Sequence, residues 1–330
     1  MEKFVAEKVE AVRKKIIDQT KKADFEAFWE KNVAEMRKVP LKVERTRMES
    51  PYDSAMTTYE VTYNTHDDTV IHAYFGLPAN AEKKLPCVVY FHGGSEKRVL
   101  MHSVVQTGVA VLSMDVRGQG GISPDHATYQ TGDVNGGLMT KGVLDENEYY
   151  LKNIFLDAVR SMDVAAQFPE VDPNRIVTMG VSQGGALSIV ASALSGRSIR
   201  CFTYVPSYCC IKQRILAGSR VFGSTHTYLK TYPQYTDRVF DVVSYFDVNN
   251  MVSLLKVPTA FNFNLDDPVC LPHFVYSAYS HANCKKTLNV YPFLEHSLAP
   301  DFQKKIHWEL SRLANGEEMI DDTFPCAEHN

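Results

Sequence analysis

The chain has 330 residues, of which 45% are hydrophobic and 22% charged, a composition typical of a globular protein. Its formal net charge of −4 gives no sign of a polyanionic partner and argues against nucleic acid as a ligand. No stretch approaches the roughly 18 apolar residues of a membrane span, so we expect no membrane contact.

The start of the chain and the cysteines predict a cytoplasmic location. The first ten residues carry charges throughout and lack the apolar core of a secretory signal. The 7 cysteines are irregularly spaced and include no Cys-x-x-Cys pair, as expected of free thiols in a reducing compartment. A redox role for the adjacent Cys209 and Cys210 is the alternative to their burial as small apolar side chains, which we favour.

Residues 1–47 are predicted to form an N-terminal helical extension. Val5, Val9 and Val12 recur at three- and four-residue steps among charged residues, and a second helical segment covers 24–36. Two interpretations are open. The extension packs on the main domain, or it binds a partner chain.

From residue 56 onward the pattern predicts strands and then alternating strands and helices. The alternation over 57–65 and 69–77 indicates an antiparallel pair. Short apolar runs typical of buried parallel strands follow at 86–91, 109–115, 176–178, 200–205, 257–265 and 287–292. Helices are predicted between them and after them, over 148–168, from 183 onward, over 272–282 and over 301–314. This order predicts an α/β fold with a largely parallel sheet.

The whole chain, 1–330, is therefore predicted to be one α/β domain with additions. Residues 118–145 show little periodicity, which is common in lids and binding loops. Residues 210–250 are predicted to be a helical insertion over the active-site end of the sheet. Residues 171–175 are predicted to be the turn that leads to the strand before Ser182.

Ser182 is the strongest candidate for a reactive group. It lies in Gly180-Val-Ser-Gln-Gly184, which fits the Gly-x-Ser-x-Gly turn between a strand and a helix that exposes a nucleophilic hydroxyl. Such glycine-rich turns also occur without any catalytic role. A serine hydroxyl needs a base to become a nucleophile, and the base needs an acid to orient it.

The two partners appear in the order that α/β-hydrolases require, which is serine, acid, histidine. Asp266 and Asp267 follow one predicted strand, and His296 follows the next. Taken alone, such an aspartate could cap a helix and such a histidine could be a solvated loop residue. The order at three successive strand ends predicts a triad, with the choice between the two aspartates open at this point.

Two further predictions are made from the sequence: a role for the loop that follows residue 91, and the absence of a bound metal or cofactor. His92 precedes Gly93 and Gly94 in the type of loop that supplies a second oxyanion N–H, and its own side chain is expected to pack or form hydrogen bonds. No cluster of His, Cys and Asp has convincing metal-ligand spacing, so we expect neither a metal nor another cofactor.

Several motifs together resemble one known family. The chain is similar, from about residue 25 to the terminal helix, to the carbohydrate esterases of family 7, which group acetyl xylan esterases with cephalosporin C deacetylases. The motifs are Asp-Phe-Glu-Ala-Phe-Trp at 24–29, Asp-Val-Arg-Gly-Gln-Gly at 115–120, Gly-Val-Leu-Asp-Glu-Asn-Glu-Tyr-Tyr at 142–150, Asp-Ala-Val-Arg at 157–160 and Gly-Val-Ser-Gln-Gly-Gly at 180–185.

The resemblance implies a role for each candidate residue. It implies the α/β-hydrolase fold, with Ser182 as nucleophile, His296 as general base and Asp267 as the acid. Asp267 is preferred over Asp266 because Cys270 and the residues after it keep the family's spacing to Asp267.

The same resemblance implies the oxyanion hole and its supports. The backbone N–H groups of Gln183 and Gly94 would form the hole, and Arg117 and Gln119 would brace the active-site loops. Two positions differ from the family pattern: Gly94 replaces a tyrosine, and Ser297 follows His296 where a glutamate is common. Both changes affect the prediction of acyl and alcohol specificity.

The implied activity is removal of acetyl or other short acyl groups from esterified sugars such as xylo-oligosaccharides, and from cephalosporin-type acetyl esters. The implied partner is a small acetylated saccharide, and the implied assembly is a homo-oligomer, a hexamer in the family. The alternatives are another small-ester hydrolase or an acyltransferase of this fold, a peptidase or long-chain lipase, and a non-catalytic binding protein.

Overall fold

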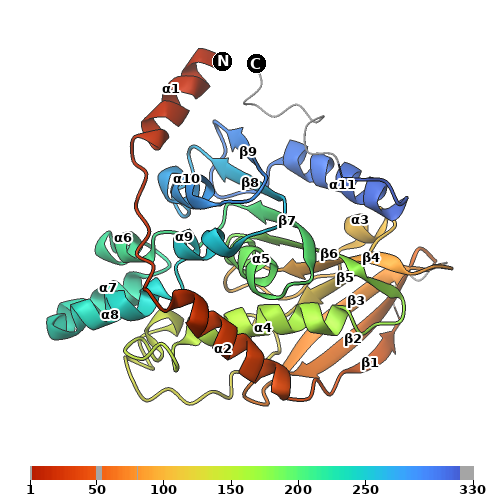
Figure 1. Ribbon diagram of the computed structural model, residues 1–330, viewed down its shortest axis with the longest axis horizontal. Coiled ribbons are helices and arrows are strands. Elements are labelled where there is room, and N and C mark those ends of the chain that lie inside the picture. Colours follow the sequence, from red (N-terminus) through yellow and green to blue (C-terminus); the bar gives the residue numbers. More distant parts are fainter. Residues whose placement is uncertain (1, 50–53, 80, 320–330) are drawn as a thin grey trace.

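A central sheet of nine strands, in the order β1-β2-β3-β5-β4-β6-β7-β8-β9, carries the functional side chains (Figure 1). The computed structural model describes residues 2–49, 54–79 and 81–319. Antiparallel pairing joins β1 to β2, β2 to β3 and β3 to β5, whereas the strands from β5 to β9 are parallel. The strands are β1 (Glu44–Met48), β2 (Met56–Asn64), β3 (Val70–Pro78), β4 (Leu85–Phe91), β5 (Ala110–Met114), β6 (Val171–Val181), β7 (Ser198–Tyr204), β8 (Thr259–Asn264) and β9 (Lys286–Tyr291).

Helices cover both faces of this sheet (Figure 1). On one face α4 packs against α5, and on the other α3 packs against α11. Every side chain of β4 is therefore buried, which explains its continuous apolar run. The helices are α1 (Glu2–Arg13), α2 (Phe25–Lys38), α3 (His102–Val105), α4 (Tyr150–Ala165), α5 (Gln183–Leu194), α6 (Ile211–Leu216), α7 (Gly223–Thr231), α8 (Thr236–Ser244), α9 (Val248–Met251), α10 (Pro272–His281) and α11 (Pro300–Ala314), with the 3-10 helices η1 (Leu138–Thr140), η2 (Pro233–Tyr235) and η3 (Val252–Leu254).

The predicted strands and helices of the α/β region are confirmed to within a few residues at their ends. The predicted antiparallel pair is β2 and β3, whose register runs from Met56 opposite Pro78 to Asn64 opposite Val70. One prediction in this region is wrong: residues 171–175 belong to β6 rather than to a turn. The strand pairing continues there because Val171 lies beside Leu85 of β4.

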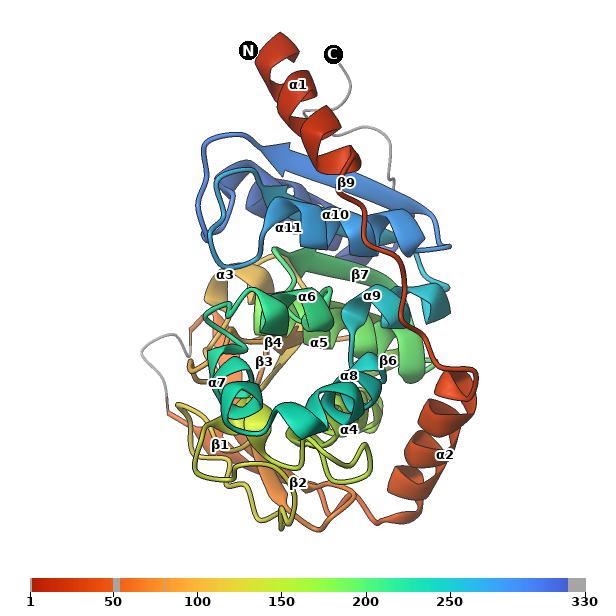
Figure 2. The same cartoon turned by 90° about the vertical axis from the view of Figure 1, so that its left-hand side faces the viewer.

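The prediction of a helical extension over residues 1–47 is wrong in its last part, because residues 44–48 form β1. This edge strand contains no apolar alternation, since its side chains are nearly all exposed. These residues form a strand because their backbone pairs with β2, not because of an apolar pattern. The two helices of the extension behave differently. Trp29 of α2 is buried and donates from Nε1 to the Tyr245 carbonyl at 3.0 Å, whereas α1 projects beyond the body of the molecule (Figures 1 and 2).

The two additions predicted inside the chain lie next to each other. Residues 118–145 contain turns and η1, and 210–250 contain α6 to α9 with η2. Thr225 of α7 donates to the Met139 carbonyl at 2.9 Å and so joins the two segments. None of the helices in the described part of the chain is long and apolar enough to cross a membrane.

Candidate active site

The turn between β6 and α5 holds Ser182 in an unusual backbone conformation. Its φ of 56° and ψ of −114° lie in a region that residues with a side chain rarely adopt. Hydrogen bonds on both sides hold the strained peptide: Ser182 N–H donates to the Tyr204 carbonyl, and Ser207 N–H donates to the Ser182 carbonyl, each at 2.9 Å. Such strain is maintained at functional sites more often than elsewhere.

Close packing around the turn explains its two glycines. A Cβ at Gly184 would lie 1.9 Å from the Phe91 carbonyl oxygen, and a Cβ at Gly180 would lie 2.3 Å from that of Gly184. Gly94 differs, because a Cβ there would approach nothing closer than 3.8 Å. The glycines of the serine turn are therefore sterically required, whereas a side chain could be accommodated at Gly94.

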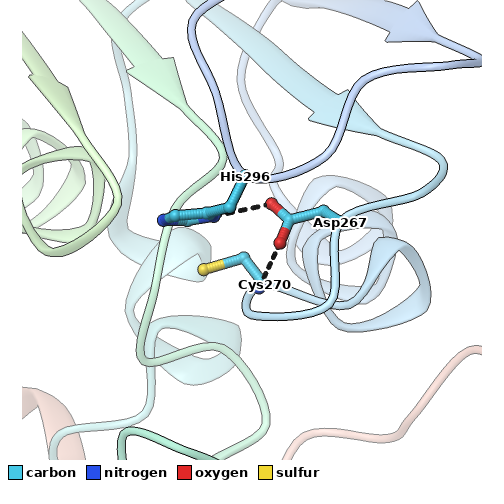
Figure 3. A group of neighbouring side chains, drawn as sticks. All are labelled: Asp267, Cys270 and His296. Atoms are coloured by element: carbon cyan, nitrogen blue, oxygen red, sulfur yellow. Dashed lines mark hydrogen bonds and ion pairs between the residues drawn. The ribbon is translucent and has the colours of Figure 1, made fainter.

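The loops after β8 and β9 bring Asp267 and His296 together (Figure 3). His296 Nδ1 and Asp267 Oδ2 are 2.8 Å apart. The other carboxylate oxygen of Asp267 accepts the N–H groups of Val269 and Cys270, both at 2.8 Å. Asp266 is exposed, whereas Asp267 is buried and hydrogen-bonded to the histidine.

This contact determines the titration of His296. Partial burial disfavours the charged imidazolium, but the hydrogen bond to Asp267 and the adjacent Cys270 sulfur favour it more. The pKa of His296 is consequently raised above its ordinary value. A histidine in this environment is a strong base whose protonated form is stabilised by the carboxylate behind it.

Asn264, the last residue of β8, holds the His296 loop and was not predicted from the sequence. Its Nδ2 donates to the carbonyls of Glu295 and Ser297, at 2.6 and 2.9 Å. These carbonyls belong to the two neighbours of His296, so the asparagine fixes the backbone on both sides of the imidazole. In the sequence, this role is indicated only by a polar residue at the end of a largely apolar strand. The structure shows that this asparagine is buried.

Cys270 completes a group of three potential metal ligands with Asp267 and His296. Their ligand atoms lie within 4.8 Å of one another, and Figure 3 shows the sulfur beside the imidazole. Two of the three are already joined by the hydrogen bond between His296 and Asp267. A metal bound here would have to replace that bond, so we interpret the group as a histidine–carboxylate pair with a neighbouring thiol.

A cavity of about 590 Å³ opens over the carboxyl ends of the parallel strands. Ser182, His296, Gln183 and Gly94 all line it, and Asp267 lies behind His296. The two additions to the domain also contribute, with Leu138 and Met139 from 118–145 and with Arg220, Val221 and Ser224 from 210–250. The structure thus brings the predicted nucleophile, base and N–H donors to one cavity.

Gln119 connects the loop after β4 to the start of α5. Its Oε1 accepts from Ser95 N–H at 2.9 Å, and its Nε2 donates to Gln183 Oε1 at 2.9 Å. The hydroxyl of Tyr208 donates to the same Gln183 oxygen at 2.6 Å. The two segments that carry the predicted oxyanion donors are therefore joined through side chains.

Arg117 lies below the cavity and does not line it. Its guanidinium is fully buried and binds both carboxylate oxygens of Asp157, at 2.6 and 2.7 Å. It also donates to Asp67 Oδ2 at 2.6 Å and to Thr65 Oγ1 at 2.7 Å. Its carbonyl accepts from the Tyr150 hydroxyl at 2.7 Å, which links this network to Gln119.

His92 has the hydrogen-bonding role that the sequence predicted. Its Nε2 accepts from Val116 N–H at 2.9 Å, and its Nδ1 lies 2.7 Å from the Gly93 carbonyl. Burial lowers the pKa of His92. The neutral ring joins the ends of β4 and β5 and shapes the loop that contains Gly94.

Comparison with known proteins places the chain in a family. Residues 3–312 match the family model described as acetyl xylan esterase (AXE1). The chain belongs to the acetyl xylan esterase family. The acetyl xylan esterase from Paenibacillus sp. R4 has a TM-score of 0.86 and 30% identity, covering 94% of this chain and 99% of that one. Acetyl xylan esterase 1 from Thermoanaerobacterium sp. JW/SL YS485 has a TM-score of 0.85 and 28% identity, covering 92% and 98%.

These two structures confirm the α/β-hydrolase fold predicted for this member of the acetyl xylan esterase family. A curated relative, acetyl esterase Axe7A of Xylanibacter ruminicola, is 27% identical over 286 residues. That alignment includes 83% of this chain but 63% of the relative, so this chain spans less than two thirds of that protein.

Proposed function

We propose that this member of the acetyl xylan esterase family is a serine esterase that removes acetyl groups from esterified sugars. The observation that carries the proposal is that the strained Ser182 and the Asp267-bound His296 line the same cavity. The family match and the acetyl xylan esterases of similar structure support the ester and the sugar.

The proposed mechanism assigns one task to each group. His296 takes the proton of the Ser182 hydroxyl as its oxygen attacks the acetyl carbonyl, and Asp267 balances the imidazolium that forms. The N–H groups of Gln183 and Gly94 stabilise the oxyanion of the tetrahedral intermediate. The sugar oxygen leaves with the proton from His296, which leaves an acetyl group on Ser182. Water activated by His296 then releases acetate.

The proposed substrates are acetylated xylo-oligosaccharides, and cephalosporin-type acetyl esters follow from the same chemistry. A cytoplasmic location and assembly as a homo-oligomer, a hexamer by family resemblance, are also proposed. The location is supported by the cysteines, because none of the six in the described part of the chain forms a disulfide.

The decisive experiment measures acetate released from acetylated xylo-oligosaccharides by the wild type and by Ser182→Ala. The nucleophile is expected to contribute a factor of about 10³ or more to kcat. Ser280→Ala, a serine of α10 outside the cavity lining, is the matched control and should keep full activity. Wild-type activity in Ser182→Ala would overturn the mechanism.

The acyl group and the reaction type are tested with the same enzyme. Rates on esters from acetyl to octanoyl should be highest for acetyl, and a maximum at long chains would contradict the proposed substrate class. Product analysis with an excess of sugar acceptor distinguishes hydrolysis from acyl transfer, since transfer would place the acetyl group on the acceptor.

A further inference from the structure

A second cavity, of about 350 Å³, adjoins the catalytic one. Ser224, near the start of α7, lines both. Asp133 and Gly136 form one wall of the second cavity, and residues of α7 and the residue after it form the other wall, namely Gly223, Ser224, Thr227, Tyr228, Thr231 and Tyr232. A ligand whose reacting part sits at Ser182 could therefore extend past Ser224 into this second space.

Aromatic rings cluster on the α7 side of this cavity. Tyr228 stacks on Tyr235 with ring centroids 6.3 Å apart, and Tyr232 lies 5.0 Å from Tyr228. Tyr232 and Tyr235 are 42% and 38% exposed, so they present ring surface to solvent. Among the described residues, none of the three hydroxyls has a hydrogen-bond partner. Exposed aromatic surface gathered beside a polar cavity is typical of a binding site.

The opposite wall offers hydrogen-bond acceptors. One carboxylate oxygen of Asp133 accepts from Asn135 N–H at 3.1 Å. The other oxygen, Oδ2, accepts no hydrogen bond from the described residues. On the α7 wall, the Thr227 hydroxyl is a further donor or acceptor. One wall of the cavity therefore contains tyrosine side chains and the other contains a carboxylate.

The two segments that form the walls contact each other directly. Thr225 of α7 donates to the Met139 carbonyl at 2.9 Å, and a Cβ on Gly137 would lie 3.2 Å from Ser224 Oγ. Figure 2 shows α7 beside the loops of 118–145, with η2 and α8 continuing from it. Such a preformed site needs little ordering when a ligand binds.

We propose that this second cavity is a subsite for a sugar unit next to the acetylated one. A pyranose ring has an apolar C–H face that packs on a tyrosine ring and a rim of hydroxyl groups that donate to a carboxylate. The Asp133 carboxylate favours a neutral ligand over an anionic one. This assignment rests on the proposed function, because it places the reacting sugar at Ser182.

The first test compares substrates of increasing length. In Tyr232→Ala, kcat/KM for acetylated xylotetraose should fall by about five- to tenfold through KM, with kcat unchanged. Activity on 4-nitrophenyl acetate should not change, because this ester is too short to reach the second cavity. Tyr232→Phe keeps the ring and should retain wild-type KM, and Leu216→Ala, an exposed residue of α6, is the control for surface change.

The second test measures binding without catalysis. Xylotetraose without acetyl groups should bind to Ser182→Ala in calorimetry, and the affinity should fall when Tyr232→Ala or Asp133→Asn is added. If acetate is released normally but neither variant changes the dependence on chain length, the subsite is wrong and the esterase function stands. If no acetate is released but xylotetraose binding depends on Tyr232, the subsite stands and the esterase function is wrong. A change of molecular mass in Tyr232→Ala would identify the tyrosines as a subunit contact and would also overturn the subsite.

Discussion

Ser182 has a backbone conformation that costs about 1–3 kcal/mol and is maintained by the elements around it. The strand before it, the helix after it and the hydrogen bonds to Tyr204 and Ser207 hold the chain in this conformation. Gly184 allows α5 to approach the Phe91 carbonyl, so the turn can be this tight. Ser182 thereby lines the cavity at the start of α5.

His296 yields a prediction about pH. The proposed base must be neutral to accept a proton, and the carboxylate of Asp267 raises the pKa of His296 above its ordinary value. We therefore expect kcat/KM to rise with pH through a midpoint above about 6.5. The measurement is kcat/KM on a short acetyl ester across pH, with a buffer series of constant ionic strength.

Asp267→Asn is the matched variant for this measurement. The amide cannot balance the imidazolium, so the pKa of His296 falls and the midpoint moves to lower pH. Because an amide N–H facing Nδ1 also favours the wrong tautomer, kcat should fall by about 10³- to 10⁴-fold. An unchanged midpoint in this variant would show that Asp267 does not control the histidine.

At the scale of elements, the site depends on side chains that join one strand end to another. Asn264 at the end of β8 fixes the loop after β9, and Gln119 joins the loop after β4 to α5. Arg117, after β5, binds Asp157 of α4 and Asp67 of the turn between β2 and β3. Neighbouring parallel strands are not joined by a hairpin. Side-chain contacts of this kind therefore fix how the loops at their carboxyl ends lie relative to one another.

Arg117→Ala is expected to destabilise the protein by about 3–5 kcal/mol, because it leaves the fully buried carboxylate of Asp157 without its cation. Chemical denaturation measures the loss. Arg238→Ala is the matched control, since its ion pair with Glu146 is partly exposed to solvent and should contribute about 1 kcal/mol or less. Similar losses in the two variants would contradict a structural role for the buried network.

At the scale of the whole molecule, α1 packs on its own chain through one face, on which Val9 is buried and Val5 and Val12 are partly buried. It projects from the body, where Phe4 stacks on Phe293 at 5.8 Å and both rings remain exposed, at 43% and 65% (Figure 2). Arg13 Nε donates to the Tyr276 hydroxyl at 3.0 Å near the end of the helix. Both interpretations of the extension therefore remain: one face of α1 packs on the main domain, and the exposed Phe4 and Phe293 rings are available to a partner chain.

We expect the protein to be a homo-oligomer in solution and α1 to take part in its contacts. Light scattering should give a mass several times that of one chain, and Phe4→Asp with Phe293→Asp should reduce it, because burying two carboxylates at a subunit contact is costly. Lys38→Ala, at the exposed end of α2, is the control. A wild-type protein that runs as a monomer would show the expectation to be wrong.

The sequence by itself determined the local features of this protein. Apolar periodicity marked the strands and helices of the α/β region, and the residue types around Ser182 marked the tight turn, because both depend on neighbours within a few positions. The order of serine, acid and histidine followed from the same local patterns. Strand β1 was not predicted because its side chains, which are mostly charged and exposed, show no such periodicity.

The tertiary structure decided which distant residues meet. Three features join residues about 30 to 100 positions apart in the chain. They are the contact of Asp267 with His296, the hydrogen bonds of Asn264 to the loop that contains His296, and the cavity between Asp133 and Tyr232. Periodicity indicates which face of an element is buried, but it contains no information about which loops the packed sheet brings together. The candidate residues could therefore be predicted from the chain, whereas the shape of the cavity around them required the fold.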